Sequence, residues 1–304
     1  MEAQLIPVTV IINAGAGCGY AADWTARLDA LFAAHGLEAR VTLAASGAEM
    51  IAAARAAVAA GAAMVVAGGG DGTINAVASQ LLYSGVPFGV LPLGTLNHFA
   101  KDLGIPLALD AAIANLAQGR PAMVDVGEVN GRVFLNNSSL GMYPDIVRDR
   151  EKQQRRLGRG KWLAFCWATM AALRRYPFLN VRLCVNGERR ARRTPFVFIG
   201  NNEYLMHGLN IGERARLDCG TLSLYVAQRP GRLGLLRLAF HALLGRLAQL
   251  KDFDILMSKE MTIETQHKRL RVATDGEVTI MATPLHYRIR AAALTVLVPA
   301  ARTP

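Results

Sequence analysis

The stretch of sequence that decides the fold of this chain runs Met64-Val65-Val66-Ala67-Gly68-Gly69-Gly70-Asp71-Gly72-Thr73-Ile74-Asn75. Its apolar start is short and β-branched, which predicts a buried strand, and the apolar residues from Ile74 to Leu82 keep the spacing of one helical face. Gly85 is expected to end that helix. We expect the intervening glycines to adopt positive φ and to leave room for a ligand. Backbone N–H groups at such a helix N-terminus suit phosphate oxygens.

This glycine pattern fits neither of two common phosphate-binding fingerprints. Counted from Gly68, the third glycine of G-x-G-x-x-G would fall on Thr73, and no Gly-Lys-Ser/Thr follows to form a P-loop. The Gly-Gly-Asp-Gly-Thr run instead resembles a signature of the diacylglycerol-kinase-like lipid kinases. NAD kinases and phosphofructokinases share that signature in shorter form, so alone it indicates only the wider group.

A second motif makes the resemblance specific. Residues 92–106 read Pro-Leu-Gly-Thr-Leu-Asn-His-Phe-Ala-Lys-Asp-Leu-Gly-Ile-Pro, which predicts a turn and a short helix with Thr95 as its N-cap. The stretch resembles the second lipid-kinase signature, Pro-x-Gly-Thr-x-Asn-Asp-Phe-Ala-x-x-Leu-Gly-Ile-Pro, at nearly every position. NAD kinases and phosphofructokinases lack it. The resemblance continues over almost the whole chain, through Asp125-Val126-Gly127, Phe134-Leu135-Asn136-Asn137, Leu217-Asp218-Cys219-Gly220 and Asp275-Gly276-Glu277.

The succession of elements predicts an α/β domain followed by a β domain. Strands alternate with helices up to residue 125, which is typical of a parallel sheet, and ligands of such sheets collect at the carboxyl ends of the strands. Short strand-like runs then recur to the end of the chain, and Asn130-Gly131 is a strong hairpin signal. We expect a nucleotide-binding domain over 1–125 and an antiparallel sandwich over 126–291. The resemblance implies that the tail, 292–304, returns to the first domain.

Composition narrows the class of protein and its partners. The 304 residues are 52% hydrophobic, enough for two globular domains, and Lys and Arg outnumber Asp and Glu by 34 to 23, which attracts phosphates, nucleic acid or anionic lipid headgroups. Four scattered cysteines form no C-x-x-C pair, which favours a reducing cytoplasm over a disulfide framework or a zinc site. No signal peptide is expected. The longest apolar candidate, Leu233 to Leu250, is interrupted by polar residues and predicts no transmembrane span.

The segment from Arg148 to Arg175 carries nine basic residues against two acidic ones, and its apolar residues from Trp162 onward follow helical spacing. Such a basic amphipathic helix lies peripherally on an anionic membrane, or it packs on the sandwich with its arginines in solvent. The spacing does not distinguish the two, because a helix buries one apolar face in either arrangement. Specific nucleic-acid binding is disfavoured because no DNA-reading motif accompanies the charge.

The resemblance also implies which residues carry the chemistry. Asp71 would act at the phosphate and magnesium end, Glu277 would be the general base that takes the lipid hydroxyl proton, and Asp218 is a candidate magnesium ligand. Without the resemblance, Asp275-Gly276-Glu277 is only a turn. The residues expected to hold the nucleotide are Asn13, Gly15, Gly17, Thr42, Gly68, Gly69, Gly70, Asp71, Gly72, Thr73, Thr95 and Asn97.

Three positions depart from the family pattern by losing an acid. Ala76 stands where Glu is common, His98 replaces the Asp of Asn-Asp-Phe, and Cys219 replaces the Asp before Gly220 that serves a structural magnesium. A thiol is a poor ligand for magnesium, which prefers oxygen. The first loop, with Ala14, also lacks the usual Asn-Pro.

These observations favour an ATP- and magnesium-dependent kinase that phosphorylates a hydroxyl of a membrane lipid such as diacylglycerol. Two alternatives stay open. One is a kinase of a soluble alcohol or of NAD, from the wider group. The other is a nucleotide- or lipid-binding relative that has lost its activity together with the acidic residues. The acceptor lipid and the oligomeric state are not indicated by the sequence.

Overall fold

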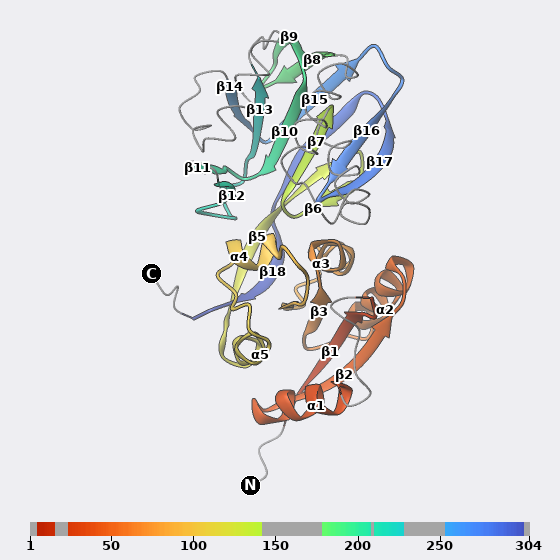
Figure 1. The fold of residues 1–304 in the computed structure, drawn as a ribbon, viewed down its shortest axis with the longest axis vertical. Coiled ribbons are helices and arrows are strands. Elements are labelled where there is room, and N and C mark those ends of the chain that lie inside the picture. The colour runs from red at the N-terminus through yellow and green to blue at the C-terminus, as the bar shows by residue number, and fades with distance from the viewer. Residues whose placement is uncertain (1–4, 16–23, 142–177, 208–209, 228–252, 301–304) are drawn as a thin grey trace, which may run out of the picture. The chain divides into compact units, whose positions relative to one another are not determined.

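The structure, a computed structural model, describes residues 5–15, 24–141, 178–207, 210–227 and 253–300 (Figure 1). The chain divides into two compact units. The first unit comprises 1–126, 216–218 and 290–304, and the second comprises 127–215 and 219–289. The domain boundary expected near Asp125 concerns independently folding parts and stays a prediction.

The first unit is built on a parallel sheet. Its strands are β1 (Ile6–Asn13), β2 (Leu37–Ala44), β3 (Val65–Gly69), β4 (Phe88–Pro92) and the later part of β18 (Leu285–Val298), in the order β2-β1-β3-β4-β18. Every pairing among these strands is parallel, which confirms the expected α/β class. The helices are α1 (Trp24–Ala34), α2 (Gly47–Ala59), α3 (Asp71–Ala78), α4 (His98–Asp102) and α5 (Leu109–Gln118).

The central strands of this sheet are apolar along their whole length because both of their faces are covered. Val10, Ile11 and Ile12 of β1 are completely buried, and so are Val65 to Ala67 of β3. Continuous apolar runs of this kind are typical of parallel strands, whereas strands with one solvated face alternate. β1 and β3 pair side by side at the centre of this buried sheet, with Ile12 in register with Gly68.

Helix α3 is shorter than the sequence predicts. It ends at Ala78 instead of reaching Gly85, so Leu81 and Leu82 lie beyond it. Ser79 Oγ donates back to the Ala76 carbonyl at 2.7 Å. The next amide, of Gln80, bonds three residues back to Val77, so the helix tightens and ends. Gly85, with φ 73°, marks the later turn.

The second unit is an antiparallel sandwich, as expected. One sheet has the order β14-β13-β10-β7-β16-β17, and in the other β8 pairs with β9 and β15, and β15 pairs with the first part of β18. Both sheets contribute to a single buried core, which includes Leu224 from one and Ile263 from the other. The strands not yet given bounds are β5 (Arg120–Val129), β6 (Arg132–Phe134), β7 (Asn137–Gly141), β8 (Leu179–Val185), β9 (Glu188–Thr194), β10 (Phe196–Asn201), β11 (Leu205–His207), β12 (Asn210–Glu213), β13 (Leu222–Ala227), β14 (Phe253–Ser258), β15 (Glu260–Thr265), β16 (Arg269–Thr274) and β17 (Glu277–Ala282).

Three hairpins of this unit share one turn chemistry. Asn130-Gly131, Asn186-Gly187 and Asp275-Gly276 each place two successive residues at positive φ. These values fit the two-residue type I′ turn, whose twist matches that of the flanking strands. The first of them joins β5 to β6 with Val129 opposite Arg132, which confirms the expected hairpin.

Two segments discussed from the sequence, 148–175 and 233–250, lie outside the described residues. Within the described ranges no helix is long and apolar enough to cross a membrane.

Candidate active site

Three loops of the first unit follow parallel neighbouring strands. Strand β1 ends at Asn13, β3 at Gly69 and β4 at Pro92, and Gly69 is in register with Pro92. The carboxyl ends of parallel strands share one edge of a sheet. The two glycine loops and the Pro92 loop therefore leave the sheet on the same side.

Asn13 links the first glycine loop to the second. Its side-chain amide donates to the Thr73 hydroxyl at 3.2 Å, and its Oδ1 accepts from the Gly15 backbone at 2.9 Å. Thr73 is almost fully buried in the first turn of α3. One half-buried amide thus fixes the start of the Gly15 loop relative to the N-terminus of α3. Gly17 of the same loop lies outside the described residues.

The glycines of the second loop serve close packing, and the expectation that they adopt positive φ is wrong. None of Gly68, Gly69, Gly70 and Gly72 belongs to the positive-φ residues of the described chain. A Cβ on Gly68 would come within 2.9 Å of Ile12, and one on Gly69 within 2.5 Å of the Thr73 hydroxyl. Both glycines lie buried in β3, where neighbouring chains leave no room for a side chain.

The closest approach joins the second loop to the Pro92 loop. A Cβ on Gly94 would lie 2.4 Å from the Cα of Gly70 and 3.0 Å from its nitrogen. The two backbones therefore touch directly, and only glycine is accommodated at position 94. Gly70 itself has more space, since its Cβ would lie 3.5 Å from Gly94. The backbones of the two loops meet at this point with no side chain between them. Phosphate oxygens can approach backbone N–H groups at such places.

Asp71 ties the same two loops together. Its carboxylate accepts from the backbone N–H of His98 at 3.2 Å and of Phe99 at 3.1 Å, the first two residues of α4. A negative charge at a helix N-terminus is stabilising. Asp71 therefore caps a helix other than its own. Carboxylate oxygens have further lone pairs beyond these two bonds, and the role expected for Asp71 at a phosphate or magnesium stays a prediction.

The N-cap expected at Thr95 is wrong. Helix α4 begins at His98, its N-cap is Asn97 with φ 51°, and Thr95 lies exposed in the preceding loop. The Asn97 side chain explains this, because it accepts from Gly94 N–H at 3.0 Å and donates to the carbonyls of Gly94 and Pro92. Buried Asn97 thus holds the loop that Gly94 and Thr95 present. Its direct contact with a nucleotide stays a prediction.

Thr42 lies on the next strand. It is exposed on β2 in register with Ile11, two residues before that strand ends. The structure therefore gathers the loops after β1, β3 and β4 by direct contacts, and leaves Thr42 at the neighbouring strand end.

Glu277 stands at the turn between β16 and β17 in the second unit. Its carboxylate accepts from Arg132 Nη2 at 2.6 Å, and Arg132 Nε donates to Thr274 at 3.0 Å. Thr274 and Glu277 are the register pair that closes the turn. Glu277 is 60% exposed and Arg132 38% exposed. The carboxylate is accessible and its position is set by one guanidinium.

Asp275 anchors the same turn from the other side. Its carboxylate accepts from three consecutive backbone N–H groups, those of Leu135, Asn136 and Asn137, at 2.7 to 3.0 Å. Buried Arg214 donates to the Leu135 carbonyl at 2.7 Å and to the Asn136 side chain at 2.8 Å. The Asp-Gly-Glu turn is thus held in place by the hydrogen bonds that Asp275 accepts from the backbone before β7 and at its start.

The acidic residues do not form a ready metal site. Asp218 is half exposed and takes a two-point ion pair from Arg216, at 2.9 and 3.2 Å. Cys219 is exposed, and its backbone N–H bonds Asn202. Over the described ranges, no three His, Cys, Asp or Glu side chains gather closely enough to hold a metal ion. In the part of the chain that the structure describes, the protein residues alone therefore do not fit a preformed magnesium site.

Comparison with known proteins identifies the family. A family profile described as the diacylglycerol kinase catalytic domain matches residues 7–129, and another, described as the YegS C-terminal NAD kinase beta sandwich-like domain, matches residues 144–298. The diacylglycerol kinase of Mycobacterium tuberculosis (strain H37Rv) is 30% identical over 241 residues, which cover 76% of this chain and 75% of the relative. The chain belongs to the diacylglycerol-kinase-like family of lipid kinases.

One further relative and one solved structure are similar to this lipid-kinase family member. A protein of Enterobacter sp. (strain 638) named "Probable lipid kinase YegS-like" is 32% identical over 174 residues, so the match spans 54% of this chain and about half, 56%, of the relative. A solved structure of a diacylglycerol kinase from Bacillus anthracis covers 98% of this chain and 99% of its own, with a TM-score of 0.71 and 20% identity. At that identity the likeness concerns the fold.

Sequence reasoning missed one residue that contacts Glu277, Arg132, and it missed the role of Asp275, which it named only as part of a motif. Arg132 holds Glu277, and Asp275 seats the turn that carries it. The only signal for Arg132 was its position directly after Asn130-Gly131, where an arginine is ordinarily solvent-exposed.

Proposed function

We propose that this protein transfers the γ-phosphoryl group of ATP, in the presence of magnesium, to a hydroxyl group of a membrane lipid such as diacylglycerol. One observation carries the proposal: the backbones of Gly70 and Gly94 meet without any side chain between them, in loops that Asn13 and Asp71 tie together. Loops of exposed amides beside a helix N-terminus are suited to the phosphates of a nucleotide.

The proposed roles follow from phosphoryl-transfer chemistry, which consists mainly of positioning and charge stabilisation. Backbone N–H groups from Gly70 to Gly72 would hold phosphate oxygens, and the exposed hydroxyls of Thr42 and Thr95 would add contacts to the nucleotide. Glu277 would take the proton of the attacking hydroxyl, with Arg132 keeping its carboxylate in place.

Magnesium would reach the site on the nucleotide. This ion is commonly bound by one or two carboxylates together with substrate phosphates, and it keeps several waters. Asp71 is the candidate carboxylate for that ion. We propose no structural magnesium at Asp218, because Arg216 already neutralises that carboxylate.

The second candidate is a protein that binds nucleotide or lipid without turnover. The observation in its favour is the loss of acidic groups at Ala76, His98 and Cys219, together with the pairing of Asp218. The kinase and a nucleotide-binding relative both predict ATP binding, a relative that binds only lipid predicts none, and only the kinase predicts transfer. A kinase of NAD or of a soluble alcohol would transfer phosphate without vesicles.

The test combines binding with turnover. ATP affinity is measured by titration for the unaltered protein and for Gly70→Val. The valine side chain would occupy the volume proposed for the nucleotide phosphates, while its Cβ would lie at an ordinary contact distance, 3.5 Å, from Gly94. Labelled phosphate transfer is then measured with vesicles of a mixed lipid extract, with glycerol and with NAD. Transfer to lipid alone supports the proposal. Binding of ATP with no transfer favours the non-catalytic candidate. If Gly70→Val binds ATP as tightly as the unaltered protein does, the proposed nucleotide site is wrong.

A further inference from the structure

The hairpin of β8 and β9 in the second unit is strongly basic. Between Leu179 and Thr194 the sequence holds five arginines, Arg182, Arg189, Arg190, Arg192 and Arg193, against the single acid Glu188. β9 is the last strand of its sheet, paired on one side by β8. The charge is therefore concentrated on a sheet edge.

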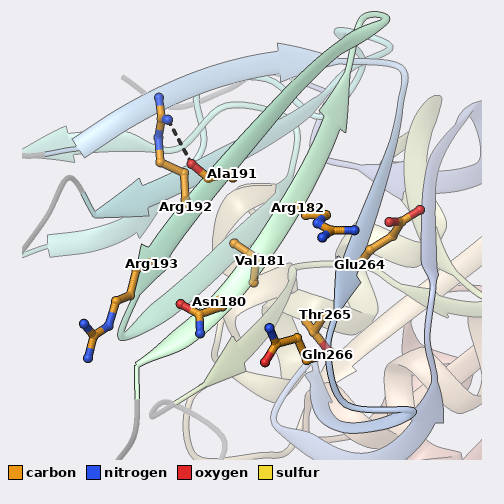
Figure 2. A pocket seen from close by; sticks show the side chains of 9 residues that line it. All are labelled: Asn180, Val181, Arg182, Ala191, Arg192, Arg193, Glu264, Thr265 and Gln266. Carbon is orange, nitrogen blue, oxygen red and sulfur yellow. Dashed lines mark hydrogen bonds between the residues drawn. The ribbon is translucent and has the colours of Figure 1, made fainter.

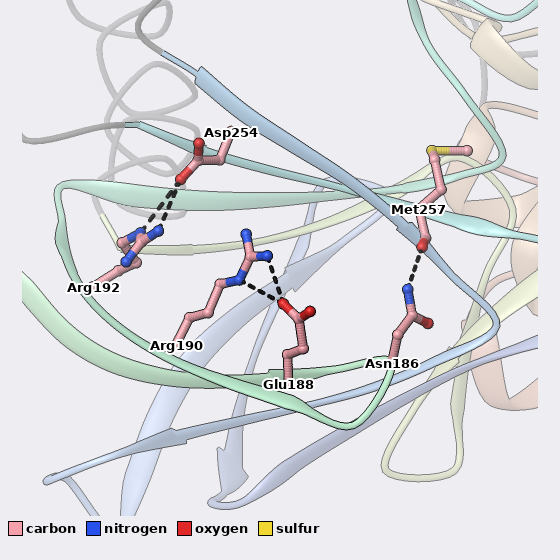
Figure 3. Close-up of polar contacts among 6 residues, drawn as sticks. All are labelled: Asn186, Glu188, Arg190, Arg192, Asp254 and Met257. Atoms are coloured by element: carbon pink, nitrogen blue, oxygen red, sulfur yellow. Dashed lines mark hydrogen bonds and ion pairs between the residues drawn. The ribbon is translucent and has the colours of Figure 1, made fainter.

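Two of these arginines are neutralised by acidic partners. Arg190 donates from Nε and Nη2 to Glu188, at 3.1 and 2.6 Å. Arg192 donates to Asp254 of β14 from two nitrogens, each at 3.3 Å. Figure 3 shows both pairs. Because side chains alternate along a strand, Arg190 and Arg192 share one face of β9, in register with the core residues Leu183 and Val181.

The other three arginines lie on the opposite face. Arg189 and Arg193 alternate with the paired arginines along β9, and Arg182 of β8 is in register with Ala191 between them. All three are exposed. Within the described ranges none of them forms a salt bridge with an acidic side chain, and the Arg193 guanidinium lies 5.0 Å from the centre of the Phe178 ring. Among the described residues, this outer face therefore presents three arginines without a salt-bridged acidic partner.

A cavity of about 350 Å³ opens beside these residues. The hairpin contributes Asn180, Arg182 and Arg193 to its lining, together with Arg192 of the paired set, and Glu264 and Gln266 contribute from the end of β15 and the residue after it (Figure 2). Glu264 is exposed and in register with Arg182, so it offsets part of the charge. Ligand pockets begin at roughly this size, about 300 Å³, and a phosphate with its substituent is small enough to enter.

Edge protection alone does not account for this arrangement. Charges on an edge strand discourage pairing with another chain, and the neutralised arginines of the inner face would serve that purpose equally. Edge protection requires neither a cavity lined by Arg182 and Arg193 nor a guanidinium stacked on Phe178. Cation–π stacking keeps an arginine ordered while leaving its charge available.

We propose that this outer face docks on an anionic phospholipid bilayer, with Arg182 and Arg193 each binding headgroup phosphates beside the cavity that they line. Guanidinium groups bind phosphate in a planar, two-point geometry. The identity of the partner rests on the proposed function, because a lipid kinase must reach a membrane. The charge pattern itself does not depend on it, and the test uses binding without turnover, so either idea can fail separately.

The experiment is co-sedimentation of the full chain with vesicles of phosphatidylcholine alone and of phosphatidylcholine mixed with phosphatidylglycerol, without nucleotide. We expect binding to the anionic vesicles only. Since a basic residue near such a surface contributes about 1 kcal/mol, the double variant Arg182→Gln/Arg193→Gln should bind roughly 30-fold more weakly. Glu264→Gln should strengthen binding, because it removes the opposing charge.

The matched control compares single variants on the same strand. Arg190→Gln and Arg193→Gln each remove one positive charge, but Arg190 is paired and faces the other side. Only Arg193→Gln should weaken binding by roughly fivefold. Equal losses from the two variants, or unaltered binding by the double variant at unchanged thermal stability, would overturn the proposal. So would tight binding of the unaltered protein to duplex DNA that the double variant loses while vesicle binding persists.

Discussion

The guanidinium of Arg132 lies 2.6 Å from the carboxylate of Glu277 and also reaches Thr274 at 3.0 Å, so β6 holds both residues that close the β16–β17 turn. An exposed ion pair of this kind contributes about 0–1 kcal/mol to stability. Its consequence is therefore geometric, because it fixes where the carboxylate of Glu277 points.

Replacing Arg132 tests that interpretation. Arg132→Gln should lower the rate of phosphate transfer by up to about 100-fold, since small misplacements of a reacting group are costly. ATP affinity and the melting temperature should change little. Arg132→Lys should recover part of the rate because it restores a cation beside Glu277.

The readout that separates positioning from a general structural effect is kcat measured at saturating ATP and lipid. If Arg132→Gln lost ATP affinity or melted much earlier while kcat stayed the same, the residue would have no positioning role. Arg190→Gln is the control, because it breaks an exposed ion pair elsewhere in the second unit.

A second prediction concerns the bond between Asn13 and Thr73. A double-mutant cycle with Asn13→Ala and Thr73→Val should give a coupling free energy of about 0.5–1.5 kcal/mol in denaturant unfolding, as for a typical half-buried hydrogen bond. Both single variants should also weaken ATP binding, because each loosens the first loop from α3. Additive effects within experimental error would show that the bond does not couple the loops.

The contact between Gly94 and Gly70 yields a third prediction. Gly94→Ala places a methyl group 2.4 Å from the Cα of Gly70, and overpacking of that degree should lower the free energy of unfolding by about 1–3 kcal/mol. Gly47→Ala, at the start of α2, is the matched control: apart from its chain neighbours and its own helix backbone, no atom lies within 4 Å of an added Cβ. It should be neutral or slightly stabilising. Similar effects of the two substitutions on unfolding would contradict the close approach.

The sequence predicted the two-unit class because its signals are local. Apolar runs such as Val65 to Ala67 are buried on both sides and read as parallel strands, and Asn130-Gly131 fixes a hairpin by backbone chemistry alone. β9 was missed for the same reason. Its sequence, Glu-Arg-Arg-Ala-Arg-Arg-Thr, contains no apolar alternation, and only the preceding Asn186-Gly187 turn indicates that a strand follows.

The site was harder to predict because it depends on contacts far apart in the chain. The strand, glycine run and helix were predicted in the right order, but Gly68 and Gly69 belong to β3 instead of the loop, their backbone angles are ordinary and they serve close packing. That Asp71 caps α4, 27 residues away, depends on how β3 and β4 pair. No local pattern contains that information, and the same holds for Arg132 and Glu277.

A fourth prediction concerns magnesium. With Asp218 paired to Arg216 and a thiol at Cys219, the melting temperature should respond little to magnesium in the absence of nucleotide, since only ligands that bind the folded state raise it. Cys219→Asp should create a response by adding an oxygen ligand. A strong magnesium-dependent shift in the unaltered protein, measured by thermal unfolding, would mean that Asp218 or backbone carbonyls already suffice.

We propose that this chain is a working lipid kinase with Glu277 as its general base. The most direct measurement is the transfer of labelled phosphate from ATP to a mixed lipid extract in vesicles, for the unaltered protein and for Glu277→Gln. We expect transfer to lipid by the unaltered protein, a loss of about 10²–10⁴-fold in the Gln variant, and equal ATP affinity in both. A Gln variant as active as its parent would contradict the assignment of Glu277, and no transfer to any lipid by the unaltered protein would contradict the kinase itself.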